Sequence, residues 1–125
     1  SAPFTPAGAD IQFERALRGV LTNNNADCDS AVAYLNGWLV ENQGSFRDAL
    51  RQQGEELLVI YDWCHARLSP AQISTLVTRW NGYLDTEIAD DFANQGAEAN
   101  NYWWGRTRNT LMWGIASFGD NSGCS

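Results

Sequence analysis

Residues 57–72 read LLVIYDWCHARLSPAQ, and this stretch decides the class of fold. Its first half, Leu57–Cys64, is apolar on nearly all sides, which is typical of a helix buried on most of its surface. Periodicity alone also allows a buried strand, but the helix-favouring residues on both flanks favour a helix. In the second half, Ser69, Pro70 and Gln72 form a capping box, with serine at the N-cap and proline at the first helical position. One helix therefore ends within this stretch and another begins.

Apolar spacing and capping residues extend this pattern outward along the chain. They predict five helices, which begin after Asp10, after Asp29 or Ser30, at Ser45, after Ser69 and near Asn101. The last helix should run to about Phe118 and end with Gly119 at the C′ position. No segment indicates a strand. We therefore expect one all-α domain of about five helices in antiparallel hairpins over residues 1–125, with an irregular lead-in at 1–9 and a tail at 120–125.

The composition of the chain argues against some classes of binding partner. The chain has 125 residues, 44% of them hydrophobic, which is enough for one folded domain with its own core. Its net charge of −7 argues against nonspecific binding to nucleic acid or to anionic membranes. No apolar run approaches the ~18 residues that a membrane span needs. The Pro- and Ala-rich start is typical of an exported protein, so we expect a secreted or periplasmic location, with the oligomeric state left open.

No metal or cofactor is predicted. The three cysteines, Cys28, Cys64 and Cys124, show neither CxxC nor zinc-like spacing, so one disulfide with a free thiol and three buried thiols both remain open. Asn and Asp alternate between positions 23 and 29, like half of a calcium loop. The glycine and the closing glutamate of such a loop are missing.

The segment NNYWWGRTRN, residues 100–109, combines three amides, three aromatic rings and two guanidinium groups. Rings can stack on sugar faces, while amides and arginines hold hydroxyls and carboxylates. The candidate sugar-contacting residues are Asn100, Trp103, Trp104, Arg106 and Arg108. Two other interpretations stay open: an asparagine-capped helix whose tryptophans pack in the core, and arginines that pair with surface carboxylates.

His65 is the only histidine of the chain, and Asp62 stands three residues before it. Residues three apart can meet on one face of a helix, so the two side chains can form an oriented acid–base pair. A local hydrogen bond without catalytic role is the alternative. Tyr61 and Trp63 point to different sides of the same helix, so one can reach a groove while the other lies in the core.

The order of four motifs resembles the helical domain of uronate polysaccharide lyases, which include the alginate lyases and the heparinase II/III group. The motifs are YDW at 61–63, LSPAQ at 68–72, NNYWW at 100–104 and GDN at 119–121. The resemblance covers roughly residues 55–121, and it implies a fold similar to part of an incomplete (α/α) toroid.

The resemblance also implies a reaction. These enzymes cleave an anionic polysaccharide by β-elimination: the uronate carboxylate is neutralised, a base removes the adjacent proton and an acid protonates the leaving oxygen. It assigns neutralisation to Asn101. Tyr102 stands where alginate lyases often have histidine, and it becomes a candidate acid or base beside His65. The family's further catalytic residues lie beyond the length of this chain.

Two other classes of function remain. A non-catalytic carbohydrate-binding or protein-interaction module would use the same aromatic segment as its contact surface. An (α/α) glycoside hydrolase would need two carboxylates around the cleaved bond, and the aromatic segment has only Glu98 nearby.

Overall fold

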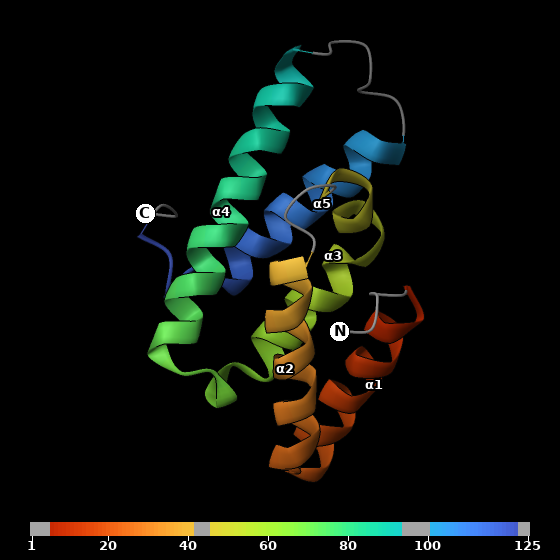
Figure 1. The fold of residues 1–125 in the computed structure, drawn as a ribbon, viewed down its shortest axis with the longest axis vertical. Coiled ribbons are helices and arrows are strands. Elements are labelled where there is room, and N and C mark those ends of the chain that lie inside the picture. Colours follow the sequence, from red (N-terminus) through yellow and green to blue (C-terminus); the bar gives the residue numbers. More distant parts are fainter. Residues whose placement is uncertain (1–5, 42–45, 94–100, 123–125) are drawn as a thin grey trace.

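The computed structural model describes residues 6–41, 46–93 and 101–122 (Figure 1). Its elements are α1 (Pro6–Thr22), α2 (Asn25–Glu41), α3 (Phe46–Trp63), the short 3-10 turn η1 (His65–Arg67), α4 (Pro70–Ala93) and α5 (Asn101–Ala116). These ranges contain no strand, so the predicted all-α class is confirmed.

Helix α3 lies at the centre of the arrangement (Figure 1). It packs against α1, α2 and α5, while α1 and α2 form an antiparallel hairpin at one end of the molecule. Helix α4 runs along the opposite side, and the chain after α5 returns towards it. Helix α5 packs far more on α3 than on α4, so the last two helices are not a closely packed hairpin.

The capping box and the buried helix before it are both confirmed. The Ser69 amide donates to Gln72 Oε1 at 2.9 Å, and the Gln72 amide donates to Ser69 Oγ at 3.2 Å. In α3 the predicted run is buried on most of its surface, with Leu57, Ile60 and Tyr61 at most 1% exposed, whereas Asp62 and Trp63 are exposed. The core continues into α4 and α5 through a stack of tryptophan rings.

The turn between α1 and α2 is shorter than predicted. Asn23 has a left-handed backbone (φ 52°), and the Asn24 amide donates to the Gly19 carbonyl at 2.8 Å, which makes a Schellman ending for α1. Asn24 Oδ1 then accepts from the Ala26 amide at 3.0 Å and caps α2. The prediction of a cap at Asp29 or Ser30 is therefore wrong, because Asn24 already caps the helix five residues before Asp29.

The ends of the chain also differ from the prediction. Helix α1 begins at Pro6, so residues 6–9 are helical rather than irregular, and Asp10 lies inside the helix. Proline is favoured in the first turn, where its missing N–H costs no hydrogen bond. At the other end, α5 stops at Ala116, and Gly119 does not adopt the left-handed conformation of a C′ glycine.

A disulfide joins Cys28 of α2 to Cys64 at the end of α3. This resolves the cysteine alternatives for two of the three residues; Cys124 lies outside the described residues. Both bridged cysteines are at most 5% exposed. Disulfides persist in oxidising compartments, so the bridge fits an environment outside the cytosol.

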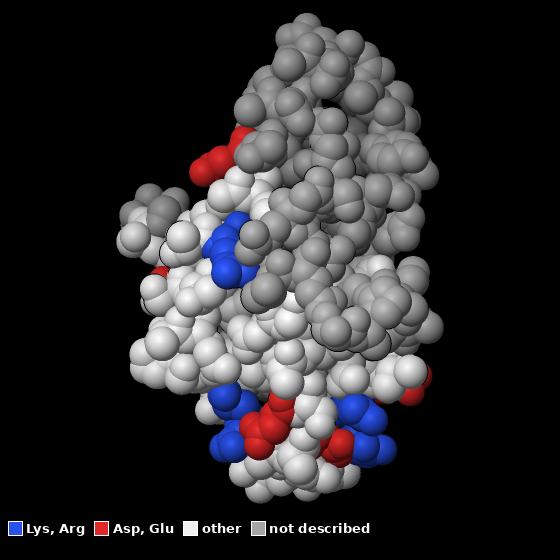
Figure 2. Space-filling model, viewed as in Figure 1, with Lys and Arg blue, Asp and Glu red and all other residues white. Residues whose placement is uncertain are grey.

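The aspartates of the supposed calcium loop lie on α2, where they form ion pairs. Asp27 pairs with Arg18 and Asp29 pairs with Arg67, each through two hydrogen bonds. Figure 2 shows basic and acidic groups side by side at this end of the molecule. The described part of the chain holds no cluster of three or more potential metal-binding side chains. Within the same ranges, no helix has the length and apolarity needed to cross a membrane.

Candidate functional site: a polar groove along α4

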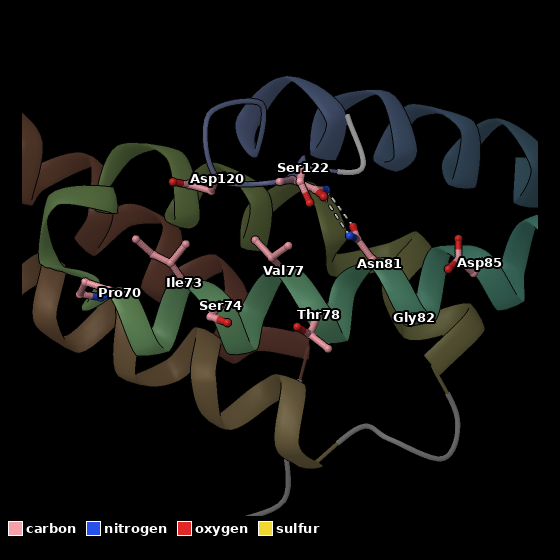
Figure 3. Close-up of a pocket in the computed structure, with 11 residues that line it drawn as sticks. Pro70, Ile73, Ser74, Val77, Thr78, Asn81, Gly82, Asp85, Asp120 and Ser122 are labelled. Atoms are coloured by element: carbon pink, nitrogen blue, oxygen red, sulfur yellow. Dashed lines mark hydrogen bonds between the residues drawn. The ribbon is translucent and has the colours of Figure 1, made fainter. Parts of the chain in front are cut away.

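An open groove of about 920 Å³ runs along α4, between this helix and the turn that follows α5 (Figure 3). Its α4 wall carries Ser74, Thr78 and Gly82, four residues apart, which share one face of a helix. Because these side chains are short or absent, they leave room beside the helix. The lining residues are Pro70, Ile73, Ser74, Val77, Thr78, Asn81, Gly82, Asp85, Asp120, Asn121 and Ser122.

Two asparagines form a reciprocal amide pair in the wall of the groove. Asn81 Nδ2 donates to Asn121 Oδ1 at 3.0 Å, and Asn121 Nδ2 donates back to Asn81 Oδ1 at 2.9 Å (Figure 3). The indole N–H of Trp113 donates to the same Asn81 oxygen at 2.9 Å. Trp113 itself stacks on Trp80 in the core, with 5.2 Å between ring centroids. The pair is therefore anchored to the buried aromatic core.

Ser117 builds the turn that carries the second asparagine. Its hydroxyl donates to the Trp113 carbonyl at 2.7 Å, which is a back-bond to the preceding turn of α5. Its own carbonyl accepts from the amides of Asp120 and Asn121 at 2.8 and 2.9 Å. These bonds end the helix without a C′ glycine and turn residues 120–122 towards α4. The predicted tail therefore contains three residues that line the groove, and one of them, Asn121, is only 6% exposed.

Asp120 stands at one end of the groove and accepts two hydrogen bonds on one oxygen. The Tyr61 hydroxyl donates to Asp120 Oδ2 at 2.5 Å, and His65 Nε2 lies 2.7 Å from the same atom. The bond from Tyr61, followed by that from His65, lowers the pKa of Asp120 below its ordinary value of 3.8, against the opposing effect of burial. Burial, together with the bond to Asp120, raises the pKa of Tyr61. At neutral pH Asp120 is therefore ionised and Tyr61 keeps its proton.

This geometry assigns a tautomer to His65. An ionised carboxylate accepts only, so His65 Nε2 must carry the hydrogen that lies between them. In the neutral ring Nδ1 is then the basic atom, and the side chain is 42% exposed. Asp120 thus holds the orientation of the His65 ring.

The predicted pairing of His65 with Asp62 is wrong. Helix α3 ends at Trp63, and His65 belongs to the 3-10 turn that follows, so the regular helical spacing between the two residues is lost. The partner is Asp120, 55 residues further along the chain. Tyr61 and Trp63 do separate: Tyr61 is buried, whereas Trp63 is 37% exposed and lies against Phe13.

The segment 100–109 is described only in part. Trp104 is 61% exposed on the first turn of α5, and Arg108 pairs with Glu55 at 2.9 Å, which is the surface pairing named as an alternative. Asn109, by contrast, is buried. Asn101, Tyr102, Trp103 and Arg106 belong to α5, but their side chains, like the whole of Asn100, lie outside the described residues.

The candidate catalytic residues are not brought together. Asn101 begins α5, while the Asp120–His65 pair lies beyond the other end of this helix. At ~1.5 Å per residue, the 16 residues of α5 span ~24 Å. Asn101 and His65 therefore cannot act on the same carbon atom of a substrate.

Three residues of the groove, Asn81, Asp120 and Asn121, were not predicted as site residues. Asp120 and Asn121 belong to the GDN motif, which predicted only the end of a helix. Asn81 directly follows the core residue Trp80. An amide side chain next to a buried tryptophan was the one sequence signal that could have indicated a site residue here. What the sequence lacked was any indication that these positions, about 40 residues apart, face each other.

No family model, curated protein or solved structure matches this chain. A fold alone does not define a function.

Proposed function

We propose that this chain is a carbohydrate-binding helical domain and that the saccharide lies in the groove along α4. Small-molecule sites combine apolar surface with a few convergent polar groups. The groove has both, with Ile73 and Val77 on the apolar side and hydroxyl, amide and carboxylate groups around them. Sugars present the same mixture, since C–H faces alternate with hydroxyls that donate and accept.

The observation that carries the proposal is the reciprocal pair of Asn81 and Asn121. Each amide nitrogen has two hydrogens, and Asn81 Nδ2 uses one of them to reach Asn121 Oδ1. The other is available to a ligand hydroxyl. Because the Trp113 indole already holds the pair, binding does not have to order these side chains, and pre-ordered groups favour affinity.

Calorimetric titration with neutral, amine-bearing and acidic oligosaccharides tests this function. Gly82→Phe places a ring in the groove, where the glycine has open space around it. Trp104→Ala changes the exposed ring at the start of α5 instead. We expect saturable binding that Gly82→Phe abolishes and Trp104→Ala preserves. The reverse pattern would move the site to α5, and no binding to any of the three classes rejects the proposal.

The second candidate is β-elimination on a uronic-acid polysaccharide, as the resemblance to uronate lyases implies. The observation in its favour is the exposed ring of Trp104, which follows Asn101 by three residues on α5. In this function Asn101 neutralises the uronate carboxylate and Tyr102 supplies the acid or base. His65 takes no part, because it lies at the far end of α5. The fold is then part of an (α/α) toroid in a secreted or periplasmic enzyme.

The second function is tested by measuring whether the elimination product forms. Elimination leaves an unsaturated sugar whose ultraviolet absorbance can be followed with alginate, heparin or chondroitin. The full natural protein should form this product, and Asn101→Ala should lose most of the rate while His65→Ala keeps it. Absence of product from all three substrates removes the elimination proposal and leaves sugar binding in place.

A further inference from the structure

We infer that the groove along α4 selects saccharides that carry amino groups, so that its ligand is a cationic rather than an acidic glycan. This inference rests on the proposed sugar-binding function and adds the charge of the ligand. Two carboxylates, Asp85 and Asp120, line the groove, and no arginine or lysine is among its described lining residues. An ammonium group is the natural partner for such a surface.

Asp120 lines the groove and uses only one of its two carboxylate oxygens in hydrogen bonds. Both of its hydrogen bonds, from Tyr61 and His65, fall on Oδ2. Oδ1 is left to accept from a ligand, and the side chain is 22% exposed. The two bonds hold the carboxylate in place, and they lower its pKa, so that it is ionised at neutral pH.

Asp85 provides a second carboxylate at the opposite end. In Figure 3 Asp120 lies near Ile73, whereas Asp85 lies beyond Gly82. The twelve residues from Ile73 to Asp85 correspond to ~18 Å along α4. Carboxylates at opposite ends of a groove do not flank a single glycosidic bond, as the two carboxylates of a glycosidase do, so the pair does not form that kind of catalytic centre. It fits an oligosaccharide that places an amino group near each end.

A uronate in the same groove would meet two like charges on a chain whose net charge is −7. Like charges in proximity disfavour binding, and no basic lining residue compensates them. An acidic substrate is thus assigned to the start of α5 and not to this groove.

Three oligosaccharides of equal length test the inference by titration: a glucosamine oligomer, its fully N-acetylated form and a uronate oligomer. N-acetylation removes the positive charge but keeps the sugar ring. We expect the glucosamine oligomer to bind at least about fivefold more tightly than the acetylated form, and more weakly as salt increases. Asp85→Asn should remove most of this preference.

Asp62→Asn is the matched control, because Asp62 is exposed and does not line the groove. It should leave the preference unchanged. Equal affinity for the amine and acetylated forms overturns the inference while sugar binding stands. Tighter binding of the uronate also overturns it. If none of the three oligomers binds, the proposed function fails together with the inference.

Discussion

The two ends of this molecule treat their carboxylates differently. Where α1, α2 and η1 meet, each aspartate is matched by an arginine, in the pairs Arg18–Asp27 and Arg67–Asp29, and a disulfide crosslinks the helices. In the groove, Asp120 accepts hydrogen bonds from a tyrosine and a histidine, and Asp85 has no ion-pair partner within the described ranges. A carboxylate that is already paired with an arginine is not available to a ligand. A charged carboxylate that lines a groove and has no arginine partner can bind one. We therefore assign stability to the first region and binding to the second.

The largest effect should come from the crosslink in the first region. The bridge closes a separation of 36 residues, and loops of this size typically contribute about 2–4 kcal/mol. The double variant Cys28→Ser/Cys64→Ser should lose about this much free energy of unfolding, measured by denaturant titration. A reducing agent should destabilise the natural chain and leave the double variant unaffected. An unchanged denaturation midpoint in both experiments would show that the disulfide does not stabilise the fold.

In the groove, the substitution expected to have the largest effect on stability is Asn81→Ala. It leaves the Trp113 indole and the Asn121 amide without their shared acceptor, and a lost buried hydrogen-bond partner costs about 1–3 kcal/mol. Tryptophan fluorescence should report the altered surroundings of Trp113. Thr78→Ala, on the same wall of the groove, should stay within about 0.5 kcal/mol of the natural chain. Equal losses for the two variants would show that the amide pair has no special role.

Gly19→Ala tests the close contact in the α1–α2 hairpin. A Cβ at this position would lie 3.1 Å from both the Asn24 carbonyl oxygen and the Cys28 nitrogen, which are backbone atoms that cannot move aside cheaply. We expect a loss of about 1–3 kcal/mol from overpacking. Gly37→Ala on α2 has nothing within 4 Å and should gain up to about 1 kcal/mol from the reduced freedom of the unfolded chain. A neutral Gly19→Ala would contradict the tight hairpin.

The smallest effect concerns pH. Because the pKa of Asp120 is lowered in the folded state, its contribution to stability is full above the ordinary value of 3.8 and is lost as the pH falls through the folded value. The stability difference between the natural chain and Asp120→Asn should therefore shrink on acidification. Tyr61→Phe removes the bond that lowers this pKa most, so the stability that Asp120 adds should be smaller and should be fully lost at a higher pH. A constant difference across this range would exclude the linkage.

Local signals made part of this structure predictable. The capping box at Ser69 and the apolar run before Cys64 each involve residues within one or two turns, and both are confirmed. The Asn24 cap was missed, although its residue type is suitable, because Asp29 and Ser30 offered equally good caps.

The site could not be predicted in the same way, because its contacts join distant positions. His65 had a plausible local partner in Asp62, and only the path of α5 shows that Asp120 takes this place. The same holds for Asn81 and Asn121, which are 40 residues apart. Their pairing depends on where the turn at Ser117 sends the chain, and that turn is set by side-chain hydrogen bonds rather than by a glycine.

The most direct test of the central claim follows the side-chain amide signals of Asn81 and Asn121, and the indole signal of Trp113, by nuclear magnetic resonance during titration with the glucosamine oligomer. If a saccharide binds in the groove, these three signals should shift together and saturate, while the indole signal of Trp104 stays in place. Shifts confined to Trp104, or no shift at saturating concentration, would contradict a saccharide site in the groove along α4.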